Sequence, residues 1–149
     1  MPSVCVSLIK SAHKKMDATT VHEHFAPDSF DKILVDAPCS GIGLIRRKPD
    51  IKYNKENQDF SALQEIQLQI LDSVCQTLRK GGIITYSTCT IFDEENFQVI
   101  HKFLETHPNF EQVKLSHTQE DIVRDGCITI TPEQYQTDGF FIGQVKRIL

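Results

Sequence analysis

Two short apolar stretches, residues 33–35 and 82–90, give the chain its clearest strand signals. Continuous apolar runs of this length, bounded by turn residues, are typical of strands buried in parallel sheets. The first run is followed by Asp36-Ala37-Pro38-Cys39-Ser40-Gly41, and the second delivers Cys89 at its end. Sites in parallel sheets lie just beyond the carboxyl ends of the strands. Asp36, Cys39 and Cys89 therefore stand where chemistry is expected.

A helix is predicted between these strands. Apolar residues recur at helical spacing and make one apolar face, namely Leu63, Ile66, Ile70, Val74 and Leu78. We expect the helix to run from Ser61 to Lys80, with Gly81-Gly82 as its stop. A strand–helix–strand unit implies a parallel pair with a right-handed crossover. If the two strands are neighbours, ~4.8 Å apart, Cys39 and Cys89 emerge together at one sheet edge.

The rest of the chain predicts further alternation, and hence an α/β fold. Asp93 is a natural N-cap for a second helix, with Glu94 and Glu95 in its first turn and Pro108 at its end. Further strands are expected near residues 4–9, 110–115, 128–130 and 140–145, the last two as an antiparallel pair. Residues 41–59 are expected to form a long irregular loop.

Composition narrows the class of protein only slightly. A chain of 149 residues with 40% hydrophobic and 24% charged residues indicates a single globular domain. There is no apolar run near the ~20 residues that span a membrane, and no signal-peptide pattern at the start. The five cysteines form no C-x-x-C pair, which argues against a disulfide framework or a zinc site. Reduced thiols fit a cytoplasmic location best.

Charge is distributed unevenly although the net charge is only −4. Residues 46–55 hold five basic residues and one acidic residue, a local net charge of +4, directly after the first thiol motif. This run is either a solvated loop or a phosphate-binding segment for RNA. The second interpretation assigns RNA contacts to Arg46, Arg47, Lys48 and Lys52.

The two thiols admit several kinds of chemistry. Buried cysteines without a function are common. A phosphatase motif is excluded, because the position that needs arginine is Ile45. A cysteine–histidine hydrolase stays open, since histidines occur at 101, 107 and 117. A fourth interpretation is methylation of a pyrimidine: a thiolate adds to carbon 6 of cytosine, carbon 5 takes a methyl group from a sulfonium donor, and the thiol leaves after a base removes the carbon-5 proton.

Four motifs resemble the Sun/Fmu-type, RsmB-like RNA cytosine-5 methyltransferases. Asp36-Ala37-Pro38-Cys39-Ser40-Gly41 followed by Arg46-Arg47-Lys48-Pro49-Asp50 is similar to their signature motif. Tyr86-Ser87-Thr88-Cys89-Thr90 resembles their second cysteine motif, Met16-Asp17-Ala18 their short acidic motif, and Asp138-Gly139-Phe140-Phe141 their closing motif. The resemblance covers residues 14–149.

The resemblance implies a Rossmann-like fold that binds S-adenosyl-L-methionine and acts on small-subunit ribosomal RNA. It makes Cys89 the nucleophile and links Cys39 to product release. Asp36 would contact the methionine end of the cofactor and the target base. Asp17 would lie at the adenine side, and Pro38 would also line the cofactor site.

The chain departs from the family pattern before Asp17. The glycine-rich cofactor loop, the acidic ribose-binding position and the amino-terminal RNA-binding domain have no counterpart here. We therefore interpret residues 1–149 as part of a methyltransferase catalytic domain, its carboxyl-terminal half. An exposed sheet edge would favour self-association, low solubility and loss of activity in the isolated chain. Alternatives are a non-catalytic RNA-binding remnant of this fold and, more distantly, a thiol enzyme of another class.

Overall fold

The computed structural model describes residues 3–7, 13–41 and 60–149, which form a two-stranded and a six-stranded sheet. The strands are β1 (Ser3–Ser7), β2 (His13–Asp17), β3 (Phe30–Asp36), β4 (Leu78–Thr88), β5 (Phe110–Val113), β6 (Val123–Arg124), β7 (Cys127–Ile130) and β8 (Phe140–Arg147). The helices are α1 (Val21–His24), α2 (Phe60–Cys75), α3 (Phe97–Thr106) and α4 (Pro132–Tyr135), with 3₁₀ turns η1 (Ala18–Thr20) and η5 (Glu120–Ile122).

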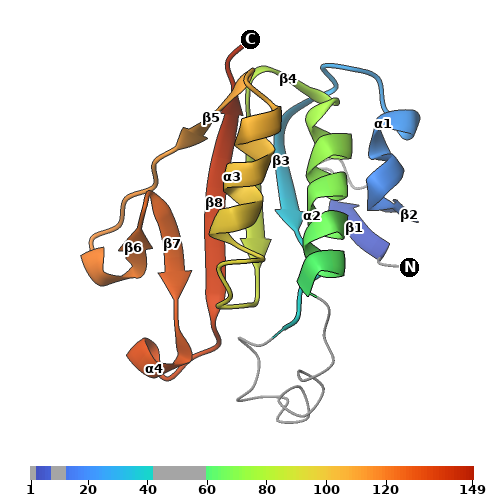
Figure 1. Ribbon diagram of the computed structural model, residues 1–149. Coiled ribbons are helices and arrows are strands. Elements are labelled where there is room, and N and C mark those ends of the chain that lie inside the picture. The colour runs from blue at the N-terminus through green and yellow to red at the C-terminus, as the bar shows by residue number, and fades with distance from the viewer. Residues whose placement is uncertain (1–2, 8–12, 42–59) are drawn as a thin grey trace.

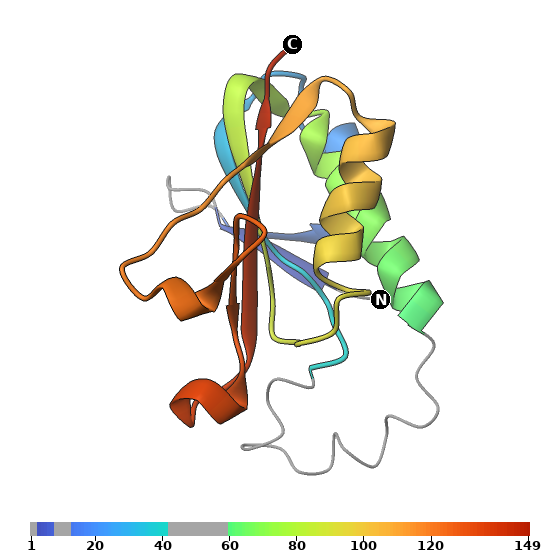
Figure 2. The ribbon, with the colours of Figure 1, turned by 60° about the vertical axis from the view of Figure 1, so that its left-hand side comes forward.

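The larger sheet is mixed, and its core lies between one of its faces and two helices. Its order is β3-β4-β8-β7-β6, with β5 also paired to β8. Helices α2 and α3 lie side by side over one face (Figure 1, Figure 2). Every second side chain along these strands belongs to the core and is almost fully buried, including Val35, Ile84, Tyr86, Phe141 and Val145. Leu34, on the other face of β3, is 65% exposed.

Strands β3 and β4 are parallel neighbours, which confirms the central prediction. Their register pairs Val35 with Tyr86 and Asp36 with Ser87. Both arrows point to the same edge of the sheet in Figure 1. The segments that follow the two strands therefore start side by side.

The predicted end of the first helix is wrong. Helix α2 ends at Cys75, and residues 78–80 already belong to β4. The amide and the hydroxyl of Thr77 both donate to the carbonyl of Val74 and so close the last turn. Leu78 is fully buried and pairs with Phe30. The conformational freedom of Gly81, whose φ is +81°, is used inside the strand, where the register with β3 shifts.

The start of the second helix is also later than predicted. Helix α3 begins at Phe97 with Asn96 as its N-cap residue, not at Asp93. Residues 93–96 form turns that bring Glu95 and Asn96 inward, and both side chains are buried. The predicted first-turn role of Glu95 is therefore wrong, and its actual position matters for the site.

The other predicted strands are present. β1 covers part of residues 4–9, β5 most of residues 110–115, and β7 pairs antiparallel with β8. Nearly all of the predicted loop 41–59 lies outside the described residues. Strand β3 ends the six-stranded sheet in the described part of the chain, and self-association there stays a prediction. Across the described ranges, no helix combines the length and apolar character needed to cross a membrane.

Candidate active site

The two thiols meet at the carboxyl edge of the sheet. Cys39 follows β3 by three residues, and Cys89 comes directly after β4. Their sulfur atoms lie 3.1 Å apart, although 50 positions separate them in sequence. Both residues are half-buried. The structure thus confirms that the chain places the two predicted thiols together.

The contact between the thiols makes their acidities different. Either thiol can donate in this contact; with Cys39 as the donor, the hydrogen bond lowers the pKa of Cys89 below its usual value. The same hydrogen bond, together with burial, raises the pKa of Cys39. The thiolate is the nucleophilic form of cysteine. In this arrangement Cys89 is the sulfur that more readily forms the thiolate.

Replacing Cys39 with alanine is expected to raise the pKa of Cys89. The substitution removes the donor that stabilises the Cys89 thiolate, and this hydrogen bond is the largest cause of the lowered value. The pH dependence of Cys89 alkylation by iodoacetamide, followed by peptide mass spectrometry, measures the effect. Cys127→Ala serves as control, because that buried thiol lies on β7. An unchanged midpoint in Cys39→Ala would contradict the assignment.

The predicted acidic and cofactor residues take different positions. Asp36 is exposed at the end of β3, where its carboxylate accepts a hydrogen bond of 3.2 Å from Ser87 Oγ. Pro38 is half-buried. Asp17 ends β2 and accepts from the Thr19 amide at 2.9 Å, which lowers the pKa of the carboxyl. Arg46, Arg47, Lys48 and Lys52 lie outside the described residues.

A buried carboxylate lies behind the thiols. It belongs to Glu95, which was predicted to be in the first turn of a helix. Glu95 is fully buried and accepts from the amide of Ser40 at 2.8 Å and from its hydroxyl at 2.6 Å. Gln67, also fully buried, donates to Glu95 at 3.3 Å and to the Pro38 carbonyl at 2.9 Å. The Tyr86 hydroxyl donates to the Glu95 carbonyl at 2.7 Å.

The neighbouring residue Asn96 holds the second thiol segment in the same way. Its amide group donates to the Thr90 carbonyl at 3.0 Å, and its amide oxygen accepts from the Thr88 hydroxyl at 2.5 Å. One signal for such residues was available in the sequence. Gln67 falls on the helix face formed by Leu63, Ile70 and Val74, where a polar side chain needs a buried partner.

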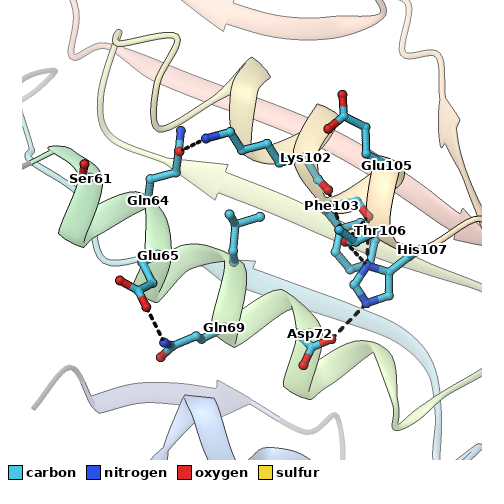
Figure 3. Close-up of a pocket in the computed structure, with 11 residues that line it drawn as sticks. Ser61, Gln64, Glu65, Gln69, Asp72, Lys102, Phe103, Glu105, Thr106 and His107 are labelled. Atoms are coloured by element: carbon cyan, nitrogen blue, oxygen red, sulfur yellow. Dashed lines mark hydrogen bonds and ion pairs between the residues drawn. The ribbon is translucent and has the colours of Figure 1, made fainter.

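A groove between α2 and α3 lies elsewhere on the molecule (Figure 3). It has a volume of about 760 Å³ and ends at Asp72 and His107. Asp72, Cys75 and His107 bring donor atoms within 4.8 Å of one another, a set that could hold a metal ion. Two of these atoms already pair, since His107 Nε2 lies 3.0 Å from Asp72 Oδ1. This group links the two helices and is not part of the thiol site.

The position of the histidines weakens the hydrolase alternative. Helix α3 begins beside the thiol segments and ends near the opposite edge of the sheet (Figure 1). His107 follows that far end and contacts Asp72 and the Phe103 carbonyl. The side chains of His101 and His117 are exposed. The structure therefore pairs Cys89 with a second thiol rather than with any of these three imidazoles.

Comparison with known proteins identifies the family. Residues 6–146 match the family described as 16S rRNA methyltransferase RsmB/F. The chain is 44% identical over 157 residues to a probable ribosomal RNA small subunit methyltransferase B of Bacillus subtilis (strain 168). That alignment covers 95% of this chain and 35% of the relative. The corresponding protein of Photorhabdus laumondii is 40% identical, with 84% of this chain and 28% of the relative covered. The chain thus spans about a third of their length.

Solved structures agree with this match. A methyltransferase homolog protein from Pyrococcus horikoshii superposes with a TM-score of 0.62 at 31% identity, covering 87% of this chain and 42% of that one. NSun6 from the same organism, solved with SFG, has the same fold, with a TM-score of 0.68, 23% identity, and 91% and 34% coverage. The mixed sheet is thus the Rossmann-like methyltransferase fold that the motifs predicted. The chain belongs to the 16S rRNA methyltransferase RsmB/F family.

Proposed function

We propose that this chain carries the catalytic thiols of an enzyme that methylates carbon 5 of cytosine in small-subunit ribosomal RNA, with S-adenosyl-L-methionine as methyl donor. The observation that carries the proposal is the 3.1 Å contact between Cys39 and Cys89 at the carboxyl edge of two parallel strands. The relatives named above are ribosomal RNA methyltransferases. Their names support the RNA substrate, and the thiol chemistry supports cytosine as the target base.

Cys89 is the nucleophile of the first chemical step in this proposal. Its thiolate adds to carbon 6 of the cytosine ring, which makes carbon 5 nucleophilic enough to take a methyl group. A new sulfur–carbon bond therefore forms before methylation and must break afterwards. Cys39 lies within reach of the same sulfur and is proposed to assist that release as a base for the carbon-5 proton. When bound, S-adenosyl-L-methionine supplies the electrophilic methyl group.

The two acidic residues assigned to the cofactor, Asp36 and Asp17, differ in how free their carboxylates are to accept further hydrogen bonds. Asp36 is exposed beside the thiols, and its carboxylate can accept further donors such as an ammonium group. Asp17 is half-buried, and one of its oxygens already caps η1. Asp36 is therefore the residue we assign most directly to the methionine end, with Pro38 between it and Cys39 in sequence. The basic segment from Arg46 to Lys52 is proposed to hold RNA phosphates.

Replacing Asp36 with asparagine is expected to weaken binding of S-adenosyl-L-methionine by about tenfold or more, because a charge-assisted hydrogen bond is lost. Calorimetric titration measures this, in the 149-residue chain if it binds the methyl donor alone and otherwise in a longer methyltransferase chain that contains these residues. Asp31→Asn is the matched control, since Asp31 lies near the start of β3 and pairs with Arg79. Equal affinities of Asp36→Asn and the control would contradict the role of Asp36.

A chain that gives no heat with the methyl donor would support the interpretation of residues 1–149 as part of a methyltransferase catalytic domain. RNA binding without binding of the donor would favour the alternative of a non-catalytic RNA-binding remnant. Incorporation of a labelled methyl group into cytosine of small-subunit ribosomal RNA would support the enzyme.

A further inference from the structure

The segment after β4 contains two adjacent buried polar side chains that the proposed chemistry does not use. Glu95 is 0% exposed and Asn96 is 1% exposed. Burying a carboxylate is costly unless hydrogen-bond donors satisfy its oxygens. Two of the donors that satisfy Glu95 come from Ser40, next to Cys39, and the third is Gln67 of α2.

Glu95 holds the Cys39 segment on both sides of the thiol. The Ser40 amide and hydroxyl, one position after Cys39, donate to the two carboxylate oxygens. Gln67 donates to Glu95 and also to the carbonyl of Pro38, one position before Cys39. Three donors directed at a single carboxylate leave that segment little freedom to move.

Asn96 holds the Cys89 segment on both sides of the other thiol. It accepts from Thr88, one position before Cys89, and donates to the carbonyl of Thr90, one position after it. A direct contact then joins the two segments, because Ser40 Oγ lies 3.0 Å from Thr90 Oγ1. The four residues that flank the thiols thus all bond to Glu95 and Asn96, directly or through Gln67.

We propose that Glu95 and Asn96 act together as the positioning pair of the active site, with Glu95 fixing Cys39 and Asn96 fixing Cys89. Neither side chain touches a sulfur in the contacts described above, so their effect is on the distance and orientation of the two thiols. This inference rests on the proposed function for its meaning in catalysis, because the second thiol is useful only if it stays within reach of the first.

The test measures how fast the two thiols form a disulfide, a reaction that needs neither RNA nor a methyl donor. Diamide oxidises two neighbouring thiols: both sulfur-bound hydrogens pass to its nitrogen–nitrogen double bond, and a disulfide forms. The rate of the Cys39–Cys89 disulfide, followed by peptide mass spectrometry, reports how often the sulfurs meet. Misplacing reacting groups by about 1 Å can cost on the order of 10²-fold in rate.

We expect Glu95→Ala to slow this disulfide by roughly tenfold or more, while Glu94→Ala leaves the rate unchanged because that neighbouring side chain is exposed. Glu95→Gln should restore most of the rate. Its amide oxygen still accepts from the Ser40 amide, and its NH₂ group can donate to Ser40 Oγ. Because glutamine also restores the volume of the side chain, Glu95→Met is the packing control: it has a similar volume but no acceptor oxygen, and it should not restore the rate. Circular dichroism and thermal melting establish that each variant is folded.

Ser40→Ala is the second variant, for the case in which Glu95→Ala does not fold. It removes the hydroxyl contacts to Glu95 and Thr90 but keeps the backbone contact, so a smaller decrease is expected. Equal disulfide rates in the wild type, Ser40→Ala and folded Glu95→Ala would overturn the positioning role. A slowed disulfide in a chain that methylates no RNA would instead leave the positioning role intact and count against the proposed function.

Discussion

Replacing Cys89 with serine is expected to abolish the covalent complex with RNA and to reduce methyl transfer by a factor on the order of 10³ or more. Serine keeps the size and the hydrogen bonding of the side chain, but its hydroxyl is not ionised near neutral pH. Without addition of a thiolate to carbon 6, carbon 5 of cytosine stays a poor nucleophile. The loss should therefore appear in the rate of the chemical step rather than in RNA affinity.

RNA that contains 5-fluorocytosine makes the result visible on a denaturing gel. A fluorine atom at carbon 5 cannot be removed as a proton, so the methylated adduct stays attached to the protein. In a chain that binds the methyl donor, we expect the unmodified protein and Cys75→Ala to form this stable band and Cys89→Ser to form none. Cys75 lies at the end of α2, where it bonds to the Asp72 carbonyl, away from the thiol site. A band of equal strength in Cys89→Ser would show that the nucleophile is another residue.

Cys39→Ser distinguishes the roles of the two thiols in the same experiment. If Cys39 assists release, its loss should leave addition possible and slow the later steps, so that an adduct persists even with ordinary cytosine RNA. The opposite pattern, with an adduct in Cys89→Ser and none in Cys39→Ser, would exchange the two assignments.

The largest effect on stability is expected at Phe141. Truncation to alanine should lower the free energy of unfolding by about 3–5 kcal/mol, because a fully buried aromatic ring leaves a cavity. The ring packs edge-on against Phe97, with ring centroids 5.1 Å apart, and against Tyr86, with ring centroids 6.3 Å apart. Tyr86 in turn bonds to Glu95, so the same cavity lies directly behind the active site.

Phe140 is the matched control, since it is the preceding residue on the same strand and its side chain is 40% exposed. Phe140→Ala should cost about 1 kcal/mol or less. Urea denaturation of both variants under the same conditions gives the comparison. Similar losses at the two positions would mean that the strand does not separate a buried face from an exposed one.

The sequence predicted the parts of this fold that depend on apolar pattern and on the order of the elements. The run Ile33 to Val35 and the run from Gly82 both became strands, and the helix between them made them parallel. From that alone, Cys39 and Cys89 could be brought to one edge. Helix ends were predicted less well, because Arg79, Lys80 and Gly81 fit a helix end locally while strand pairing with β3 requires them in β4.

The buried polar residues behind the thiols could not be predicted from the apolar pattern. Glu95 and Asn96 look like first-turn residues after a capping Asp93, and such positions are usually solvated. Their burial depends on donors from residues 38–40, which are distant in sequence and adjacent only after folding. No periodic pattern records a contact of this kind. Gln67, a polar residue on an apolar helix face, was the one local sign that a buried polar network existed.

In the proposed mechanism, with Cys39 as the donor, the contact between the two sulfurs also sets the order in which the thiols act. While Cys89 is a thiolate, it accepts the hydrogen of Cys39 and keeps that proton in place. Once Cys89 is bonded to carbon, its sulfur no longer carries a negative charge, and the main reason for the high pKa of Cys39 disappears. Cys39 can then lose its proton more readily. The attack by one thiol thus prepares the other for the next step, so that the base becomes available only after an adduct exists on which it can act.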